Sequence, residues 1–101
     1  MSIVAIVEFH IAPDHADQAR ELFGPLLKQT RAFRGAERID WLVDRDDPLA
    51  WTLYEEWRSP EDERAYRDWR QADGAVPALG DVLDARPVLR RLEAAASALR
   101  R

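Results

Sequence analysis

Cysteine is absent from this sequence of 101 residues. The absence excludes disulfides, thiolate nucleophiles, cysteine-based zinc sites and iron–sulfur clusters. An excess of basic residues is also missing, because 19 acidic residues outnumber 15 basic ones and give a formal net charge of −4. Nucleic-acid binding depends on clustered Lys and Arg that neutralise phosphates. We therefore expect no nucleic-acid partner.

Long apolar runs are missing as well. No segment approaches the roughly 20 apolar residues that are needed to span a bilayer, and the first ten residues, MSIVAIVEFH, contain no basic segment typical of a secretory signal. We expect a cytoplasmic location and no membrane partner. The two histidines, His10 and His15, do not have the spacing of metal ligands on one element, so we expect no metal site.

The composition is that of one small globular domain. Hydrophobic residues make up 47% of the chain and charged residues 34%, which is far from the composition of disordered chains. A chain of this length builds a single core, and such a core gains stability when a partner subunit covers more apolar surface. Pairing of subunits is therefore expected.

The periodicity of apolar residues predicts the order β-α-β-β-α-β. Alternating residues predict strands at 3–11, 37–43, 51–57 and 86–92, and helical spacing predicts helices at about 14–33 and after Ser59, with a short helix at 75–83. This order is typical of the α+β ferredoxin-like fold, a four-stranded antiparallel sheet with its helices on one face. We place a single domain at 1–92 and treat 93–101 as a C-terminal tail or short helix.

The predicted fold leaves one face of the sheet without helices. Strand parity places apolar and polar side chains together on this open face: Val4, Ile6, Leu42, Tyr54, Leu89 or Arg91, with Glu8, His10, Asp40 and Glu56. An apolar patch of this size is typical of an interface. We therefore expect a homodimer in which two sheets pack face to face about a two-fold axis.

The segment TLYEEWRSPEDERAYRDW at 52–69 resembles the signature of the antibiotic biosynthesis monooxygenase domain, a branch of the dimeric α+β barrel superfamily. The segments IAPDHADQARELF and RAFRGAER extend the resemblance over about 3–92. It implies a small-molecule pocket between sheet and helices, and oxygenation of a small aromatic, anthrone or quinol substrate without flavin, haem or metal. No cofactor is therefore expected. Haem-degrading relatives need a histidine after the second helix, and ADGAVPALGD contains none.

The implied activity needs a proton acceptor and a donor to a developing oxyanion. We interpret Tyr66, Glu55 and Arg86 as the candidate catalytic residues. The residues expected to line the substrate pocket are Trp57, Leu53, Trp69 and Phe23.

Several of these residues also have purely structural interpretations. Trp57 and Tyr66 can be core aromatics. Glu55 is costly to bury alone and can form an ion pair with Arg86 or Arg90. The charge run EDER at 61–64 is interpreted as a solvated helix face.

One departure from the family pattern bears on activity. Leu53 stands where well-characterised cofactor-independent members carry an asparagine. It favours the alternative of a non-catalytic dimer that binds a small ligand or assists a biosynthetic enzyme. A cyclase or isomerase on the same barrel, working by acid–base chemistry without oxygen, is a further alternative.

Overall fold

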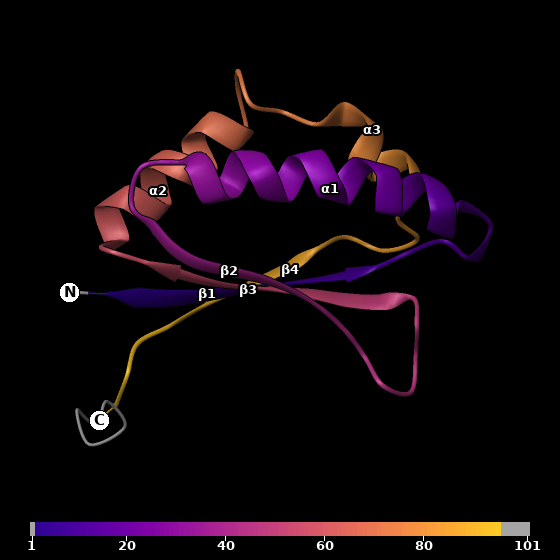
Figure 1. Ribbon diagram of the computed structural model, residues 1–101, viewed down its shortest axis with the longest axis horizontal. Helices are drawn as coiled ribbons and strands as arrows, with labels where there is room; N and C mark the ends of the chain where they lie inside the picture. Colours follow the sequence, from indigo (N-terminus) through magenta and orange to yellow (C-terminus); the bar gives the residue numbers. More distant parts are fainter. Residues whose placement is uncertain (1, 96–101) are drawn as a thin grey trace.

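The computed structural model describes residues 2–95 and contains one sheet with its helices stacked on one side (Figure 1). The elements are β1 Ile3–His10, η1 Pro13–His15, α1 Ala16–Ala32, β2 Ala36–Val43, β3 Ala50–Trp57, α2 Pro60–Arg70, α3 Pro77–Asp81 and β4 Val88–Leu92. The predicted α+β ferredoxin-like fold is confirmed, including the short helix after α2.

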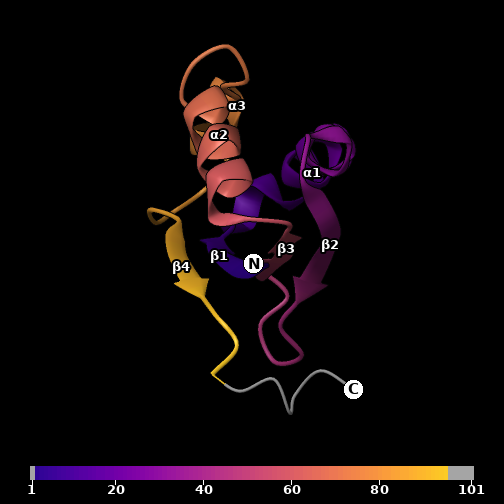
Figure 2. The ribbon, with the colours of Figure 1, turned by 90° about the vertical axis from the view of Figure 1, so that its left-hand side faces the viewer.

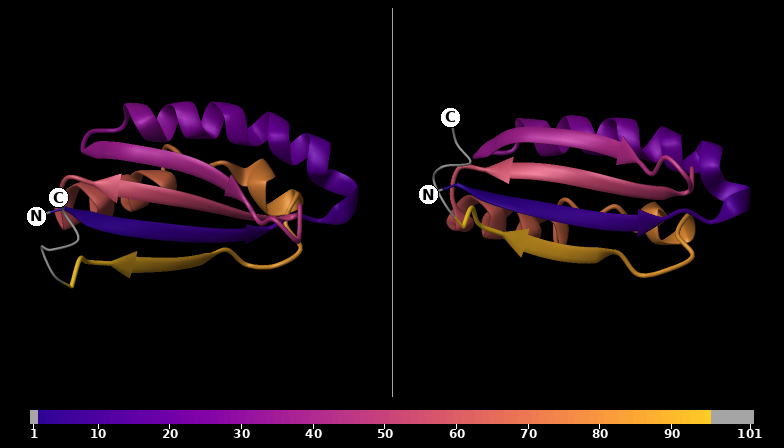
Figure 3. Two further views of the ribbon diagram at one scale, coloured as in Figure 1. Left: turned by 60° about the horizontal axis from the view of Figure 1, so that its bottom comes forward. Right: turned by 90° about the horizontal axis from the view of Figure 1, so that it is seen from below.

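The four strands are antiparallel and lie in the order β2-β3-β1-β4. Seen end-on, α1 lies over the β2 side of the sheet and α2 and α3 lie over the β4 side (Figure 2). Seen from below, all four strands are in view with no helix in front of them (Figure 3). The sheet therefore has an inner face that the helices cover and an outer face that they leave open.

The core lies between the inner face and the helices. Alternate residues of β1 and β3 are buried, as the period of two in their sequences predicts. In β3 this buried face consists of Trp51, Leu53, Glu55 and Trp57. Helix α1 contributes Ala19, Phe23, Leu26, Leu27 and Thr30 from positions spaced three and four apart. Glu55 is the carboxylate within this otherwise apolar strand face.

The start of α2 is fixed by local chemistry. The side chain of Ser59 accepts a hydrogen bond from the backbone N–H of Asp62, and Pro60 occupies the first turn. Gly35, which precedes β2, adopts a positive φ of 90°. A Cβ there would lie 2.4 Å from Cβ of Asp62, so glycine lets the start of β2 approach α2 closely.

Strand β4 differs from its predicted orientation. Ile6 pairs with Arg90, and Val4 pairs with Leu92. Because paired residues share a face, the outer face carries Val88, Arg90 and Leu92. The prediction that Leu89 or Arg91 lies there is wrong: both belong to the inner face. β4 is an edge strand whose five residues are all exposed. No alternation of buried and exposed positions therefore indicates which of its residues face the helices.

The predicted C-terminal tail is described only in part. Residues 93–95 form neither helix nor strand, and 96–101 lie outside the described residues. Within 2–95, none of the helices has both the length and the apolar character needed to cross a membrane.

Candidate functional site

A hollow of about 320 Å3 opens between the inner face of the sheet and the helices, on the β4 side. Its apolar walls come from β1, α1, α3 and the segments before and within β4: Val7, Phe9, Leu26, Val76, Leu79, Pro87 and Leu89. Its polar lining comes from one face of α2, which contributes Tyr66, Arg67 and Arg70. An apolar hollow with a few converging polar groups is the typical form of a small-molecule site.

The hydroxyl of Tyr66 is held by two neighbours. It lies 2.7 Å from Oγ1 of Thr30 and accepts a hydrogen bond of 2.7 Å from Nε of Arg70. Thr30 gives its own hydroxyl proton to the carbonyl of Leu26 at 2.9 Å, so the Tyr66 hydroxyl donates to Thr30. The Tyr66 side chain is thereby fixed in position against the hollow.

Arg67 is anchored by two buried carboxylates. Its Nη2 donates to Oε1 of Glu55, and its Nε donates to Oε2 of Glu63 at 2.7 Å. Oε1 of Glu63 accepts a further hydrogen bond of 2.9 Å from Arg91. The predicted pairing of Glu55 with Arg86 or Arg90 is therefore wrong, because helix α2 supplies the partner arginine.

Glu55 is completely buried, and its surroundings disfavour the charged form of its carboxyl. Burial raises the pKa of its carboxyl above the ordinary value, and the charge of Arg67 and the hydrogen bond from Nε1 of Trp57, 2.9 Å from Oε1, offset only part of this effect. Its Oε2 makes no hydrogen bond within the described chain. Glu55 does not line the hollow; it contacts Arg67, which does.

Most of the residues that were predicted to line the substrate pocket lie in the core. Trp57 is fully buried, with its ring centroid 4.9 Å from that of Tyr66. Phe23 packs edge-on against Phe9 and Trp51, and Leu53 is 2% exposed. Of the residues predicted from the sequence, only Tyr66 lies in the lining of the inner hollow as the structure describes it.

Trp69 and Arg86 lie at other places in the fold. Trp69 is half-buried beside Phe33, and the guanidinium of Arg70 lies 4.7 Å above its ring. Arg86 is exposed in the loop before β4 and lines a hollow with Glu8 and Leu42 of the outer face. The structure thus separates Arg86 from Tyr66 and Glu55, with which it was predicted to act.

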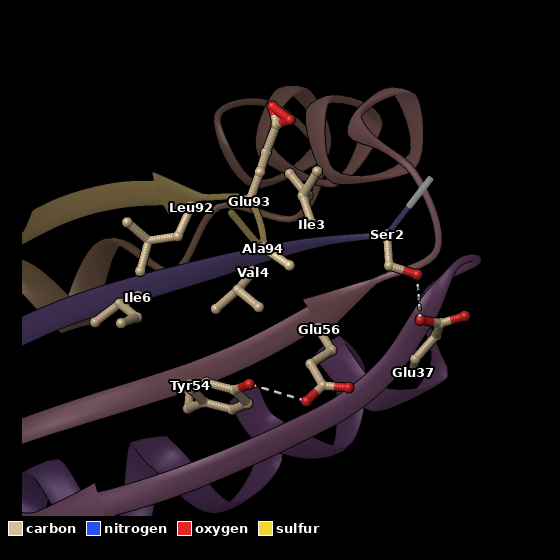
Figure 4. Close-up of a pocket in the computed structure, with 10 residues that line it drawn as sticks. All are labelled: Ser2, Ile3, Val4, Ile6, Glu37, Tyr54, Glu56, Leu92, Glu93 and Ala94. Carbon is tan, nitrogen blue, oxygen red and sulfur yellow. Dashed lines mark hydrogen bonds between the residues drawn. The ribbon is translucent and has the colours of Figure 1, made fainter. Parts of the chain in front are cut away.

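The outer face carries a second hollow at its other end, of about 450 Å3. Figure 4 shows its apolar side chains on β1 and β4, including Val4, Ile6 and Leu92, opposite Tyr54 and Glu56 of β3. The Tyr54 hydroxyl donates to Glu56 at 2.9 Å. This hollow is part of the open sheet face and not of the space between sheet and helices.

Four polar residues of the inner site were missed by the sequence analysis: Thr30, Glu63, Arg67 and Arg70. The interpretation of EDER as a solvated face fails for Glu63, which is 2% exposed. A signal for this was present in the helix spacing. Glu63 and Arg67, like Tyr66 and Arg70, are four residues apart and therefore lie on neighbouring turns of one helix face.

Metal ligation finds no support in the part of the chain that the structure describes. No group of three or more His, Cys, Asp or Glu side chains in 2–95 has an arrangement that could hold a metal ion.

One protein family and several solved structures are similar to this chain. The model of a family described as antibiotic biosynthesis monooxygenase matches residues 2–76. No curated protein sequence matches the chain significantly. Among solved structures, a conserved protein from Methanosarcina mazei Go1 is similar with a TM-score of 0.83 and 16% identity, over 92% of each chain.

Two further structures have the same fold. Rv0793 from Mycobacterium tuberculosis has a TM-score of 0.82 and 21% identity, over 95% of this chain and 97% of its own. A variant of SnoaB, a cofactor-independent oxygenase from Streptomyces nogalater, has a TM-score of 0.78 and 14% identity, over 94% of each chain. At these identities the likeness concerns the fold.

Proposed function

Because the chain belongs to the antibiotic biosynthesis monooxygenase family, we propose that it is a cofactor-independent monooxygenase of a small aromatic, anthrone or quinol substrate. The observation that carries this proposal is the hollow on the inner face, in which apolar walls meet Tyr66 and the anchored guanidinium of Arg67. Apolar walls suit a ring system.

The proposed reaction needs only the substrate and molecular oxygen. The substrate loses a proton, the resulting carbanion or phenolate passes one electron to oxygen, and the two radicals combine to form a carbon–oxygen bond. Protonation then gives a hydroperoxide. When an anthrone methylene reacts, the oxygen–oxygen bond breaks, one oxygen stays as a carbonyl and the other leaves with two hydrogens as water.

The side chains in the hollow would stabilise charge in this reaction. The guanidinium of Arg67 can donate to the oxygen on which negative charge develops, and its anchoring by Glu55 and Glu63 means that little reorganisation is needed. Tyr66, whose hydroxyl is held by Thr30 and Arg70, contributes to the wall against which the substrate packs. Since the hollow is open to solvent, the substrate proton can leave to water.

A second function is favoured by one specific observation. None of the residues that line the hollow is Asp, Glu or His, so no carboxylate or imidazole in the lining can act as a general base on a ligand. Together with the buried Leu53, this supports the alternative of a ligand-binding or accessory dimer, and it weakens the cyclase or isomerase alternative, which depends on acid–base groups.

Oxygen uptake tests the proposed activity directly. The native protein would be supplied with a panel of anthrones and hydroquinones and compared with Tyr66→Phe, Arg67→Lys and the control Arg64→Lys, an exposed arginine of the same helix. We expect protein-dependent uptake that falls about tenfold or more in Arg67→Lys, since an oxyanion donor is worth that much or more, and that is unchanged in Arg64→Lys.

Binding without oxygen uptake would contradict the proposed activity. If a folded protein binds members of the panel and consumes no oxygen with any of them, the monooxygenase proposal is wrong and ligand binding becomes the better description.

We also propose that the outer face forms a homodimer. Leu42 and Val88 are each 50% exposed and Leu92 is 40% exposed, which supports an apolar interface on this face. Val88→Arg should dissociate the dimer in sedimentation equilibrium, whereas Arg64→Lys should not. A native protein that sediments as a monomer would contradict the proposal.

A further inference from the structure

The charged groups around the inner hollow do not cancel. Glu55, Arg67, Glu63 and Arg91 form a chain of ion pairs in which acidic and basic groups alternate, so two positive and two negative charges balance. Arg70 lies outside this chain. In 2–95 no carboxylate forms a salt bridge with it, and the polar end of the hollow carries an excess positive charge.

The hydrogen bonds of Arg70 explain why it stays in place without a carboxylate. Its five N–H groups meet neutral acceptors: the hydroxyls of Tyr66 and Thr30, the side-chain oxygen of Gln29, and the carbonyls of Leu26 and Gly74. These bonds hold the guanidinium rigidly at the wall of the hollow. They do not neutralise a charge that is partly withdrawn from water.

Arg67 supplies the complementary feature, a free donor. Its Nε and Nη2 are bound by Glu63 and Glu55, and within the described residues Nη1 makes no hydrogen bond. Nη1 keeps some exposure to solvent, although the side chain as a whole is only 17% exposed. Because Arg67 also lines the hollow, its fixed guanidinium is available as a donor to a molecule there.

The walls of the hollow define the rest of the ligand. They are aliphatic or aromatic from β1, α1, α3 and β4, and the volume of about 320 Å3 is at the small end of the range for ligand sites. A flat ring system of modest size matches this space.

We propose that the ligand of the inner hollow is an aromatic anion, with a carboxylate or ionised hydroxyl bound to Nη1 of Arg67 within the positive field of Arg70. The proposal rests on the proposed function for the assumption that this hollow is the substrate site. It adds that the substrate is negatively charged when it binds. Positive charge at a fixed donor selects such a ligand over a neutral one of the same shape.

Two probes of nearly identical shape test the charge. Calorimetric titration of the native protein with 2-naphthoate and 2-naphthamide should give an affinity for the carboxylate about tenfold higher or more, and added salt should reduce the difference. A nitrophenol that ionises near neutral pH, titrated below and above its own pKa, shows whether an ionised hydroxyl serves as well. Equal affinity for naphthoate and naphthamide would overturn the proposal.

Arg70→Gln tests whether the ligand binds near Arg70. The substitution leaves no carboxylate without its partner, because in 2–95 no carboxylate forms a salt bridge with Arg70. It should weaken 2-naphthoate binding several-fold and leave 2-naphthamide binding nearly unchanged. The matched control Arg64→Gln should alter neither. An Arg70→Gln variant that weakens both probes equally would mean that Arg70 acts on structure alone, and the proposal would fall. Arg67→Lys, compared in the same way, tests the donor.

The two proposals fail separately. Binding of 2-naphthoate at the arginines, with no oxygen uptake from any anthrone or hydroquinone, would refute the monooxygenase and keep the ligand class. Oxygen uptake with equal binding of naphthoate and naphthamide would refute the ligand class and keep the monooxygenase.

Discussion

The two sides of the layer between sheet and helices are built differently. On the β2 side, beneath α1, Phe23, Trp41 and Trp51 pack ring against ring with centroids 4.8 to 5.4 Å apart. On the β4 side, beneath α2 and α3, mostly aliphatic side chains surround the hollow together with Phe9, Tyr66 and two arginines. The first side is filled by aromatic volume, and the second is left open.

The difference follows from the strands at the two edges. Wide aromatic rings from β2, β3 and α1 fill the space on one side. β4 is short, and each of its five residues is exposed. Its side chains therefore do not fill the space between sheet and helices on the other side. The densest aromatic packing therefore lies away from β4, and the hollow lies where the short edge strand leaves space beside the arginines of α2.

The largest expected effect comes from breaking the packed side. Phe23→Ala should lower the free energy of unfolding by about 3–5 kcal/mol, because it removes a fully buried ring and leaves a cavity among rigid neighbours. Leu89→Ala, on the hollow side at 37% exposure, should cost about 1 kcal/mol or less. Urea denaturation measures both. Equal losses would mean that the two sides are packed alike.

A smaller effect concerns the buried carboxylate that anchors Arg67. Burial raises the pKa of Glu55 in the folded protein, so its contribution to stability is fully present below the pKa of the unfolded chain. That contribution declines as pH rises through the higher folded pKa. Glu55→Gln keeps an oxygen for Trp57 and Arg67 and loses the titration. Urea denaturation across this pH range should therefore show a decline in the native protein that Glu55→Gln lacks.

An unchanged pH dependence in Glu55→Gln would contradict this prediction. If Glu55→Gln followed the same pH profile as the native protein, the carboxyl would titrate alike in folded and unfolded chains.

Features of the fold that depend on local sequence were predictable. The alternation in β1 and β3 and the Ser59 cap of α2 each depend on neighbours within a few residues. The parity of β4 was not, because five exposed residues show no alternation of burial, and register is then set by pairing with β1.

The site was less predictable because it depends on how α2 lies over β3. The alternation of β3 placed Glu55 on its buried face, but nothing local to β3 names its partner. Arg67 is twelve residues away in another element, and it reaches Glu55 only through the rotation of α2 about its axis. The i, i+4 spacing of Glu63 and Arg67 held part of this information.

The smallest predicted effect lies on the outer side of the sheet, at its loop end. Both ring nitrogens of His10 bond carboxylates, Nε2 to Asp47 at 2.9 Å and Nδ1 to Asp84 at 2.8 Å, and these hydrogen bonds raise the His10 pKa, Asp47 more strongly. The stabilisation is therefore full below the unfolded pKa and is lost as pH rises through the folded one. NMR titration should show that Asp47→Asn lowers the His10 pKa more than Asp84→Asn does; the reverse order would mean that Asp84 is the stronger partner.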